Sequence, residues 1–144
     1  MPRIPLVDLT VDATSRGPVF AAPWRRGMAC DAVSGAECFV SHTVFRYERW
    51  RDLPRIGAAA ERAARLFAGQ PGAVLLQQWF LPGRRLMGDL SVWRAEDDLR
   101  AFLVLPEHVA LVSAWRGRMH GVHHAWTAPP DRAAIWRRAK PLMG

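Results

Sequence analysis

Hydrophobic and polar positions follow two different periods along this chain, and the two periods mark out strands and helices. Runs rich in β-branched and aromatic residues occupy 37–47, 73–81, 85–93 and 119–128. Such composition, bounded by turn residues, is typical of strands. A Pro-Gly pair separates the second run from the third, which indicates a hairpin between them. The pattern therefore predicts four strands, the middle two of which are joined by a short turn.

Helical spacing governs two segments between these strands. Apolar residues recur every three or four positions from Leu53 to Phe67, and Pro54 stands where a first helical turn accepts proline. Acidic residues at 96–98 open a second helix, because the helix dipole favours negative charge there. Pro106 interrupts this helix, since an internal proline removes a hydrogen bond and clashes with the preceding turn. We expect one long helix, then a short helix followed by a separate segment that begins at Pro106.

The order β-α-β-β-α-β predicts an α+β fold of the ferredoxin-like kind, with an antiparallel sheet and both helices on one face. This domain spans 37–128. Residues 1–36 are rich in Pro, Gly and Ala and read as an irregular arm, with room for a short strand at 4–11. Residues 129–144 form a basic tail with a short helix at 131–139. The free face of the sheet needs cover, and a second copy of the sheet is the economical cover, so we expect a homodimer.

Composition and charge narrow the class of protein. The chain has 144 residues and a net charge of +7, and Lys140 is its only lysine. The arginines are scattered singly or in pairs, without a basic run or a zinc-finger spacing, which argues against nucleic acid as a partner. No apolar run reaches the roughly 20 residues of a membrane helix, and Asp8 and Asp12 interrupt any secretory segment. Cys30 and Cys38 are too few for a disulfide framework. We expect a cytoplasmic protein without a membrane partner.

His108 is the strongest candidate for chemistry. It falls in the first turn of the segment that Pro106 opens, and it shares an apolar helical face with Trp115. The helix dipole disfavours a charged imidazolium at this position. A neutral imidazole can ligate a metal, accept a proton or polarise a carbonyl. The alternative is a core histidine that is hydrogen-bonded to the backbone.

Other candidates lie on the first and last predicted strands. The period of two places His120 and His124 on one face of the last strand and His123 on the other. No acidic residue lies nearby in sequence to complete a metal site, so a structural or solvent role is favoured for them. His42 on the first strand is a candidate base that lines a pocket. Arg46 could orient an oxygenated substrate; the alternative is a solvated charge.

A family resemblance rests on two motifs. The first is a strand that ends in Ser91-Val92-Trp93 and is followed by Glu96, Leu99, Phe102 and a histidine; the second is the sequence WRDLP at 50–54. By these motifs, residues 38–127 resemble the dimeric α+β barrel superfamily, which includes antibiotic-biosynthesis monooxygenases and heme-degrading monooxygenases.

The resemblance implies a pocket between helices and sheet within each protomer. Cofactor-free members oxidise polyketide-like aromatics with molecular oxygen, and heme-degrading members use a helix histidine, a strand tryptophan and an asparagine. Trp93 matches the tryptophan, and His42 lies near the asparagine position. His108 comes about one turn before the family histidine, whose position is occupied by Val112. The resemblance leaves two possibilities open for the cofactor. The protein binds none, or it binds a heme whose iron is ligated by His108, with Trp93 beside it.

The sequence therefore predicts a small tailoring oxidoreductase of the monooxygenase-like kind, acting on a hydrophobic aromatic or polyketide-like small molecule. Its candidate catalytic residues are His108, His42 and Arg46. Motifs of dinucleotide-binding folds, P-loop kinases, α/β-hydrolases and zincins are missing from the chain. Two alternatives stay open: a non-catalytic ligand-binding or stress-related dimer, and a non-redox cyclase or dehydratase on the same fold.

Overall fold

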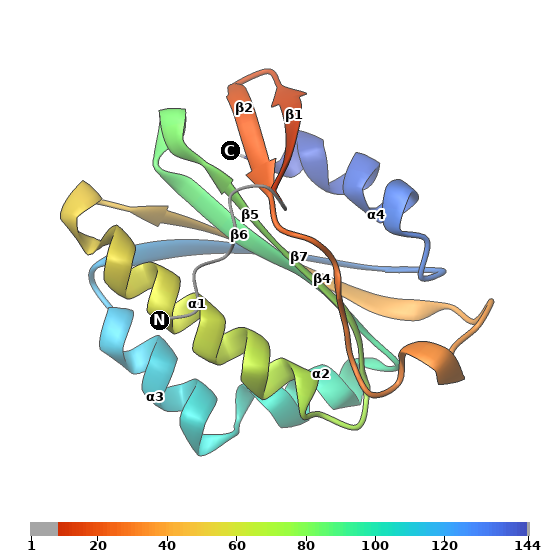
Figure 1. The fold of residues 1–144 in the computed structure, drawn as a ribbon. Helices are drawn as coiled ribbons and strands as arrows, with labels where there is room; N and C mark the ends of the chain where they lie inside the picture. The colour runs from red at the N-terminus through yellow and green to blue at the C-terminus, as the bar shows by residue number, and fades with distance from the viewer. Residues whose placement is uncertain (1–8, 144) are drawn as a thin grey trace.

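A four-stranded antiparallel sheet forms the centre of the computed structural model, which describes residues 9–143 (Figure 1). Its strands lie in the order β5-β6-β4-β7. Their bounds are β4, Cys38–Tyr47; β5, Ala73–Leu81; β6, Leu86–Trp93; and β7, Met119–Ala128. Each bound lies within one residue of the prediction. A short 3-10 turn, η4 (Pro82–Arg84), closes the hairpin between β5 and β6.

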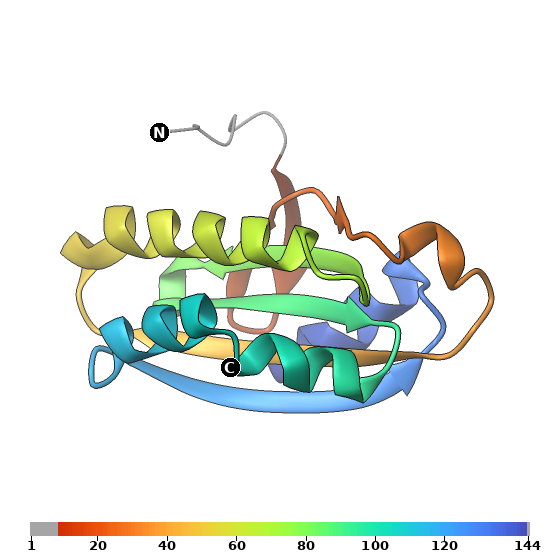
Figure 2. The ribbon, with the colours of Figure 1, turned by 90° about the horizontal axis from the view of Figure 1, so that it is seen from below.

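Three helices cover one face of this sheet (Figure 2). They are α1 (Leu53–Ala68), α2 (Glu96–Leu103) and α3 (Pro106–Trp115), and the short turn η3 (Trp50–Asp52) precedes α1. The chain breaks between α2 and α3 because Leu105 is extended and Pro106 stands in the first turn of α3. The predicted α+β, ferredoxin-like fold and its interrupted second helix are confirmed.

The opposite face is covered by the two ends of the described chain (Figure 1). The N-terminal elements are β1 (Thr10–Thr14), β2 (Gly17–Ala21), β3 (Arg25–Arg26) and η2 (Cys30–Ala32); the C-terminal ones are α4 (Arg132–Ala139) and η5 (Lys140–Leu142). Strands β2 and β3 both pair with β5 and extend the sheet. Residues 10–26 are therefore ordered strands where an irregular arm was expected. Most of the strand expected at 4–11 lies outside the described residues.

Contacts between the two ends hold this second layer together. The indole Nε1 of Trp136 donates to the carboxylate of Asp12 over 2.8 Å, and Lys140 pairs with the same group at 3.1 Å. These contacts lower the pKa of Asp12 to about 2, chiefly through the bond from Trp136. Beneath them, Val40 and Leu90 of the central strands are fully buried. The chain thus covers a large part of the face that was expected to require a second copy, whereas Val122 of β7 stays 58% exposed on it, and the homodimer stays a prediction.

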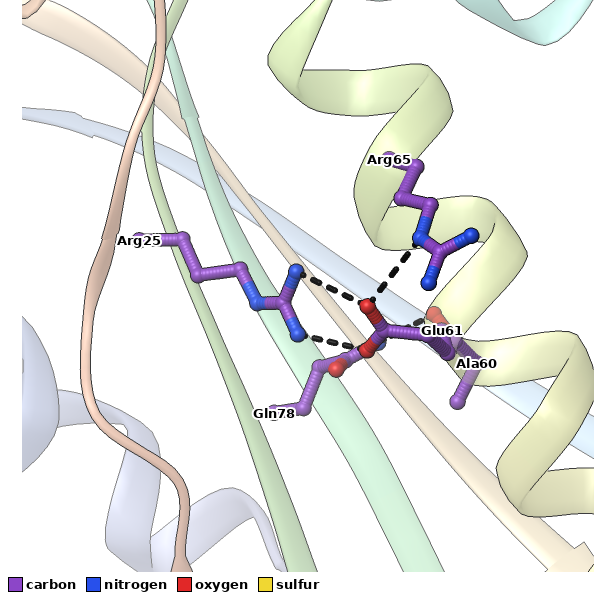
Figure 3. A network of polar contacts seen from close by, with 5 residues as sticks. All are labelled: Arg25, Ala60, Glu61, Arg65 and Gln78. Atoms are coloured by element: carbon purple, nitrogen blue, oxygen red, sulfur yellow. Dashed lines mark hydrogen bonds and ion pairs between the residues drawn. The ribbon is translucent and has the colours of Figure 1, made fainter. Parts of the chain in front are cut away.

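Polar contacts fix α1 over the sheet (Figure 3). Glu61 of α1 receives two hydrogen bonds from the guanidinium of Arg25, at 3.3 and 2.5 Å, and pairs with Arg65 one turn further along the helix. Beside them, the amide of Gln78 on β5 donates to the carbonyl oxygen of Ala60 over 2.9 Å. Both β3 and β5 are therefore tied to the middle of α1, which sets the spacing between helix and sheet.

None of the helices within residues 9–143 is long and apolar enough to cross a membrane.

Candidate active site

An apolar groove lies between the sheet and the three helices on its first face. It consists of two adjoining chambers of about 360 and 340 Å³. The residues that line both chambers are Phe45, Ala63, Gln78, Asp89, His108 and Val112. The outer chamber also contacts Trp115 and Met119, and the inner chamber also contacts Trp93 and Phe102. We call this space the groove; its size and apolar lining are typical of sites for small aromatic molecules.

A row of polar side chains crosses the sheet side of the groove. Pairing between strands places His123 opposite Thr43, Thr43 opposite Asp89, and Asp89 opposite Gln78. Residues directly opposite in antiparallel strands have Cβ atoms only about 5 Å apart. In the next row, the hydroxyl of Ser41 lies 2.7 Å from Nε2 of His123. Four strands thus contribute hydrogen-bonding groups to one otherwise apolar surface.

Asp89 is the most unusual member of this row. Its carboxyl lines both chambers, and no hydrogen bond or ion pair to it is formed by residues 9–143. Burial in these surroundings raises its pKa from 3.8 to about 7, because a low-dielectric site disfavours the charged form. Near neutral pH the group can therefore both accept and release a proton. A carboxyl in this state is suited to general acid–base chemistry.

His108 faces the groove from the helix side. The imidazole is half-buried in the first turn of α3 and packs against Phe102, with ring centroids 4.7 Å apart. Its Nδ1 lies 3.3 Å from the carbonyl oxygen of Leu103. A carbonyl only accepts, so Nδ1 carries the hydrogen and Nε2 keeps its lone pair. Burial lowers the pKa of His108 against a weaker raising effect of the Leu103 bond, which favours the neutral imidazole expected from the sequence.

Trp93 forms a rigid end to the inner chamber. Its side chain is fully buried, and its Nε1 donates to the hydroxyl of Ser91 over 2.9 Å. The indole packs edge-on against Phe67 and at a tilt against Phe102, with centroids 5.0 and 5.2 Å away. The structure therefore places Trp93 and His108 in the lining of one chamber.

His42 and Arg46 lie on the opposite face of the sheet. His42 is fully buried beneath the terminal segments, where its Nε2 accepts a hydrogen bond from Trp79 over 3.1 Å. Burial, and then the nearby His124 and His123, lower its pKa to about 4. Arg46 shares this face and is exposed. The groove contacts the alternate residues of β4 instead, so the structure does not bring His42 or Arg46 together with His108.

Asp89 and His123 are not among the residues that the sequence led us to expect in the site. An acidic residue in the middle of the apolar run 86–93 could have indicated Asp89, since a buried charge needs a reason. The period of two correctly separated His123 from His120 and His124. Only the packing of helices against that face shows which side of the strand lines a cavity.

The donor set allows a heme but not a multi-ligand metal site. Among residues 9–143, no three His, Cys, Asp or Glu side chains are grouped to hold a metal ion. His120, one of the strand histidines, contacts Glu48 at 3.0 Å outside the groove. His108, in contrast, has its Nδ1 directed to a backbone carbonyl, and its Nε2 has no hydrogen-bond partner among residues 9–143. An imidazole held in this way could serve as the one protein ligand of a heme iron.

Comparison with known proteins identifies the fold. No protein-family model and no curated protein matches the sequence. Among solved structures, SnoaB, a cofactor-independent oxygenase from Streptomyces nogalater, is 21% identical, with a TM-score of 0.58 over 67% of this chain and 98% of that chain. LmHde, a heme-degrading enzyme from Listeria monocytogenes, is 13% identical, with a TM-score of 0.57 over 85% of each chain. Rv0793 from Mycobacterium tuberculosis is 11% identical, with a TM-score of 0.56 over 66% of this chain and 98% of that chain.

Identities below 25% show a shared fold and no more. The chain has the same fold as these solved structures, which include a cofactor-independent oxygenase and a heme-degrading enzyme, and the resemblance inferred from the sequence is confirmed at the level of the fold.

Proposed function

We propose that this protein is a small monooxygenase-like oxidoreductase that binds a hydrophobic aromatic molecule in the groove. The observation that supports it best is the Asp89 carboxyl, which faces the cavity without a partner among residues 9–143 and has a pKa of about 7. A base is most effective when its pKa lies near the working pH. The similarity to a cofactor-independent oxygenase gives the same reaction class as an analogy of fold.

The proposed reaction needs only a base, oxygen and a dry cavity. The Asp89 carboxylate takes a proton from an acidic C–H or O–H of the substrate, and the negative charge spreads over the aromatic rings. The electron-rich anion reduces molecular oxygen. Oxidation of a ring methylene then inserts one oxygen atom as a carbonyl, while the second oxygen leaves as water with the two hydrogens of the methylene. The apolar groove keeps bulk water from the anion and its oxygen adduct.

His108 and the polar row orient the substrate in this scheme. The free Nε2 of His108 accepts a hydrogen bond from a substrate hydroxyl, and it is a second site for a proton on the helix side. The Ser41–His123 pair offers a further hydrogen-bonding group on the sheet side. His42 and Arg46 take no part, because they lie on the other face of the sheet.

Heme dependence is the second candidate, and the free Nε2 of His108 favours it. His108 would hold the iron, and Trp93 and Phe102 would lie in the aromatic cavity beside it. A bound heme would supply the activation of oxygen. Titration with hemin tests this candidate: a Soret band that disappears in His108→Ala supports ligation, and a band unchanged by that substitution removes the candidate.

The cofactor-free proposal is tested with dithranol, a tricyclic phenol with an acidic methylene, as probe. Oxygen uptake is followed with an electrode, after subtraction of the uncatalysed rate. We expect Asp89→Asn to lower the catalysed rate by about 10²–10⁴-fold, the usual effect of losing a positioned base. Asp97→Asn, an exposed carboxylate at the start of α2, is the matched control and should retain the rate.

Two results would contradict the proposal. The first is an Asp89→Asn variant that stays folded and keeps its oxygen uptake. The second is conversion of the probe without oxygen uptake, which would favour the non-redox cyclase or dehydratase. Probe binding without any conversion would favour the non-catalytic ligand-binding protein.

A further inference from the structure

A second concave site adjoins the groove. It is a polar cleft of about 490 Å³ on the surface where β4 leads into α1 and α3 leads into β7. Its lining residues are Arg49, Arg51, Arg55, Arg118, Glu48, Asp52 and Gly117. Four of these seven residues are arginines, so we call it the arginine cleft.

Among residues 9–143, none of the four arginines of this cleft forms an ion pair or a side-chain hydrogen bond. Glu48 is an internal counter-charge, and its pKa is lowered chiefly by the hydrogen bond from His120 and further by Arg49 at longer range. Of the two acidic side chains, Glu48 already contacts His120 at 3.0 Å. The N-terminus of α1, a helix of 16 residues, opens beside them and adds partial positive charge. Four guanidinium groups facing two carboxylates make this a cationic cleft.

Guanidinium groups recognise one kind of ligand particularly well. Their planar fork of N–H donors matches two oxygens of a carboxylate, phosphate or sulfonate, and the paired bonds are stronger than neutral ones. Unpaired arginines in a concave site therefore favour an oxyanion over a neutral or cationic group.

Consecutive residues line the arginine cleft and the groove at two places in the chain. Arg55 directly precedes Ile56 on α1, and Arg118 directly precedes Met119 at the start of β7; Ile56 and Met119 both line the outer chamber. Consecutive Cα atoms are only about 3.8 Å apart. Figure 1 shows the start of α1 and the turn from α3 to β7 at the same end of the molecule. The arginine cleft and the outer chamber therefore both have lining residues at this end of the fold.

We infer that the substrate is amphiphilic: an aromatic body occupies the groove, and a carboxylate, phosphate or sulfonate on it is held in the arginine cleft. This inference rests on the proposed function, since it assigns the second half of the same ligand. Long-range attraction between the arginines and the anionic group raises the rate at which substrate and protein associate. The bound anionic group then orients the substrate. The apolar chambers then take up the rings.

A pair of fluorescent probes separates the two halves. 8-Anilinonaphthalene-1-sulfonate and N-phenyl-1-naphthylamine share their aromatic body and differ in the sulfonate. Both are titrated into the full-length protein, into the double variant Arg55→Gln/Arg118→Gln, and into Arg62→Gln. Arg62 is an exposed arginine on the same helix that lines neither site, so it controls for general loss of positive charge. Ala63→Leu narrows the groove, since Ala63 lines both chambers.

The inference predicts that the wild-type protein binds the sulfonate probe roughly tenfold more tightly than the neutral one, a fold-change in line with two charge-assisted pairs. The double variant should lose this preference and bind the neutral probe as before. Arg62→Gln should keep the preference, and Ala63→Leu should weaken both probes.

Other outcomes overturn the inference. Equal affinity for both probes, or an equal loss in Arg62→Gln, removes the cleft as an anion site and leaves the proposed function standing. Tight sulfonate binding that Ala63→Leu does not change shows that no ligand spans the two sites. Failure of both probes to bind contradicts the inference and the proposed function together.

Discussion

Replacing Asp89 with asparagine should make the protein more stable in a way that depends on pH. The carboxyl is half-buried in the wall of the groove, and desolvation raises its pKa in the folded state to about 7, against 3.8 for an ordinary aspartate. An unfolded chain loses this proton near pH 4, whereas the folded chain retains it until about pH 7. The raised pKa therefore lowers the free energy of unfolding progressively between pH 4 and pH 7. Asparagine has no charge to bury, so Asp89→Asn removes this penalty.

The size of the effect follows from the shift. A shift of about three pKa units, at about 1.36 kcal/mol per unit, corresponds to about 4 kcal/mol above pH 7. At pH 5 only about 1.6 kcal/mol of this penalty has developed, because pH 5 lies only about 1.2 units above the pKa of 3.8 in the unfolded chain. The advantage of Asp89→Asn should thus increase by about 2–3 kcal/mol from pH 5 to pH 8. Such a gain equals a large part of the stability of a small domain.

Urea unfolding followed by tryptophan fluorescence measures this difference. The wild-type protein and Asp89→Asn are compared at pH 5 and at pH 8, so that all other titrating groups cancel at each pH. Asp97→Asn replaces an exposed carboxylate. The difference in free energy of unfolding between this control and the wild-type protein should change by less than about 0.5 kcal/mol from pH 5 to pH 8. If Asp89→Asn is stabilised equally at the two pH values, the carboxyl of Asp89 does not have a raised pKa in the folded protein. A stabilised variant without oxygenase activity would identify Asp89 as a group kept for function at the expense of stability.

Three further predictions concern the surroundings of the site. His42 has a pKa of about 4 in the folded protein, against an ordinary value of 6.5. Its contribution to the free energy of unfolding is therefore complete above pH 6.5, and about 3 kcal/mol of it is lost as the pH falls to 4. His42→Leu should reduce this loss of stability between pH 6.5 and pH 4 in urea unfolding, and an unchanged loss would contradict the prediction. Glu61→Gln disrupts the ion pairs of Figure 3 and should lower the free energy of unfolding by about 1 kcal/mol. Glu96→Gln breaks an exposed ion pair and should lower it by only about 0–0.5 kcal/mol. Equal losses of stability for the two variants in thermal unfolding would contradict this prediction. Trp93→Ala should cost about 3–5 kcal/mol, because the indole is fully buried at the end of the groove, and a loss below about 1 kcal/mol in urea unfolding would show that the chamber collapses around the gap.

Local features of the fold could be predicted because their causes are local. Pro106 ends one helix and begins the next through its own ring and missing N–H, so the break between α2 and α3 is visible in the residues themselves. The strands follow from β-branched runs bounded by turns, and the period of two separates His123 from His124 on β7. His108 was found in the same way, because its register in α3 depends only on Pro106.

The second layer of the protein could not be predicted in this way. Asp12 and Trp136 are 124 positions apart, and their hydrogen bond closes the terminal segments over the sheet. No periodic pattern encodes such a contact, since it depends on the packing of elements that are distant in sequence. The same packing buries His42 away from the site where the sequence had suggested it.

The helices and strands of this protein, their order and the residues that share a face all follow from patterns in its amino-acid sequence. Which face of the sheet encloses a cavity follows only from the packing of the helices. Because of that packing, Asp89 lines the groove and has a pKa of about 7, and four arginines line one cleft. Periodicity depends on residues that are neighbours in sequence, whereas the desolvation and the charge environment of a group depend on every segment that packs around it.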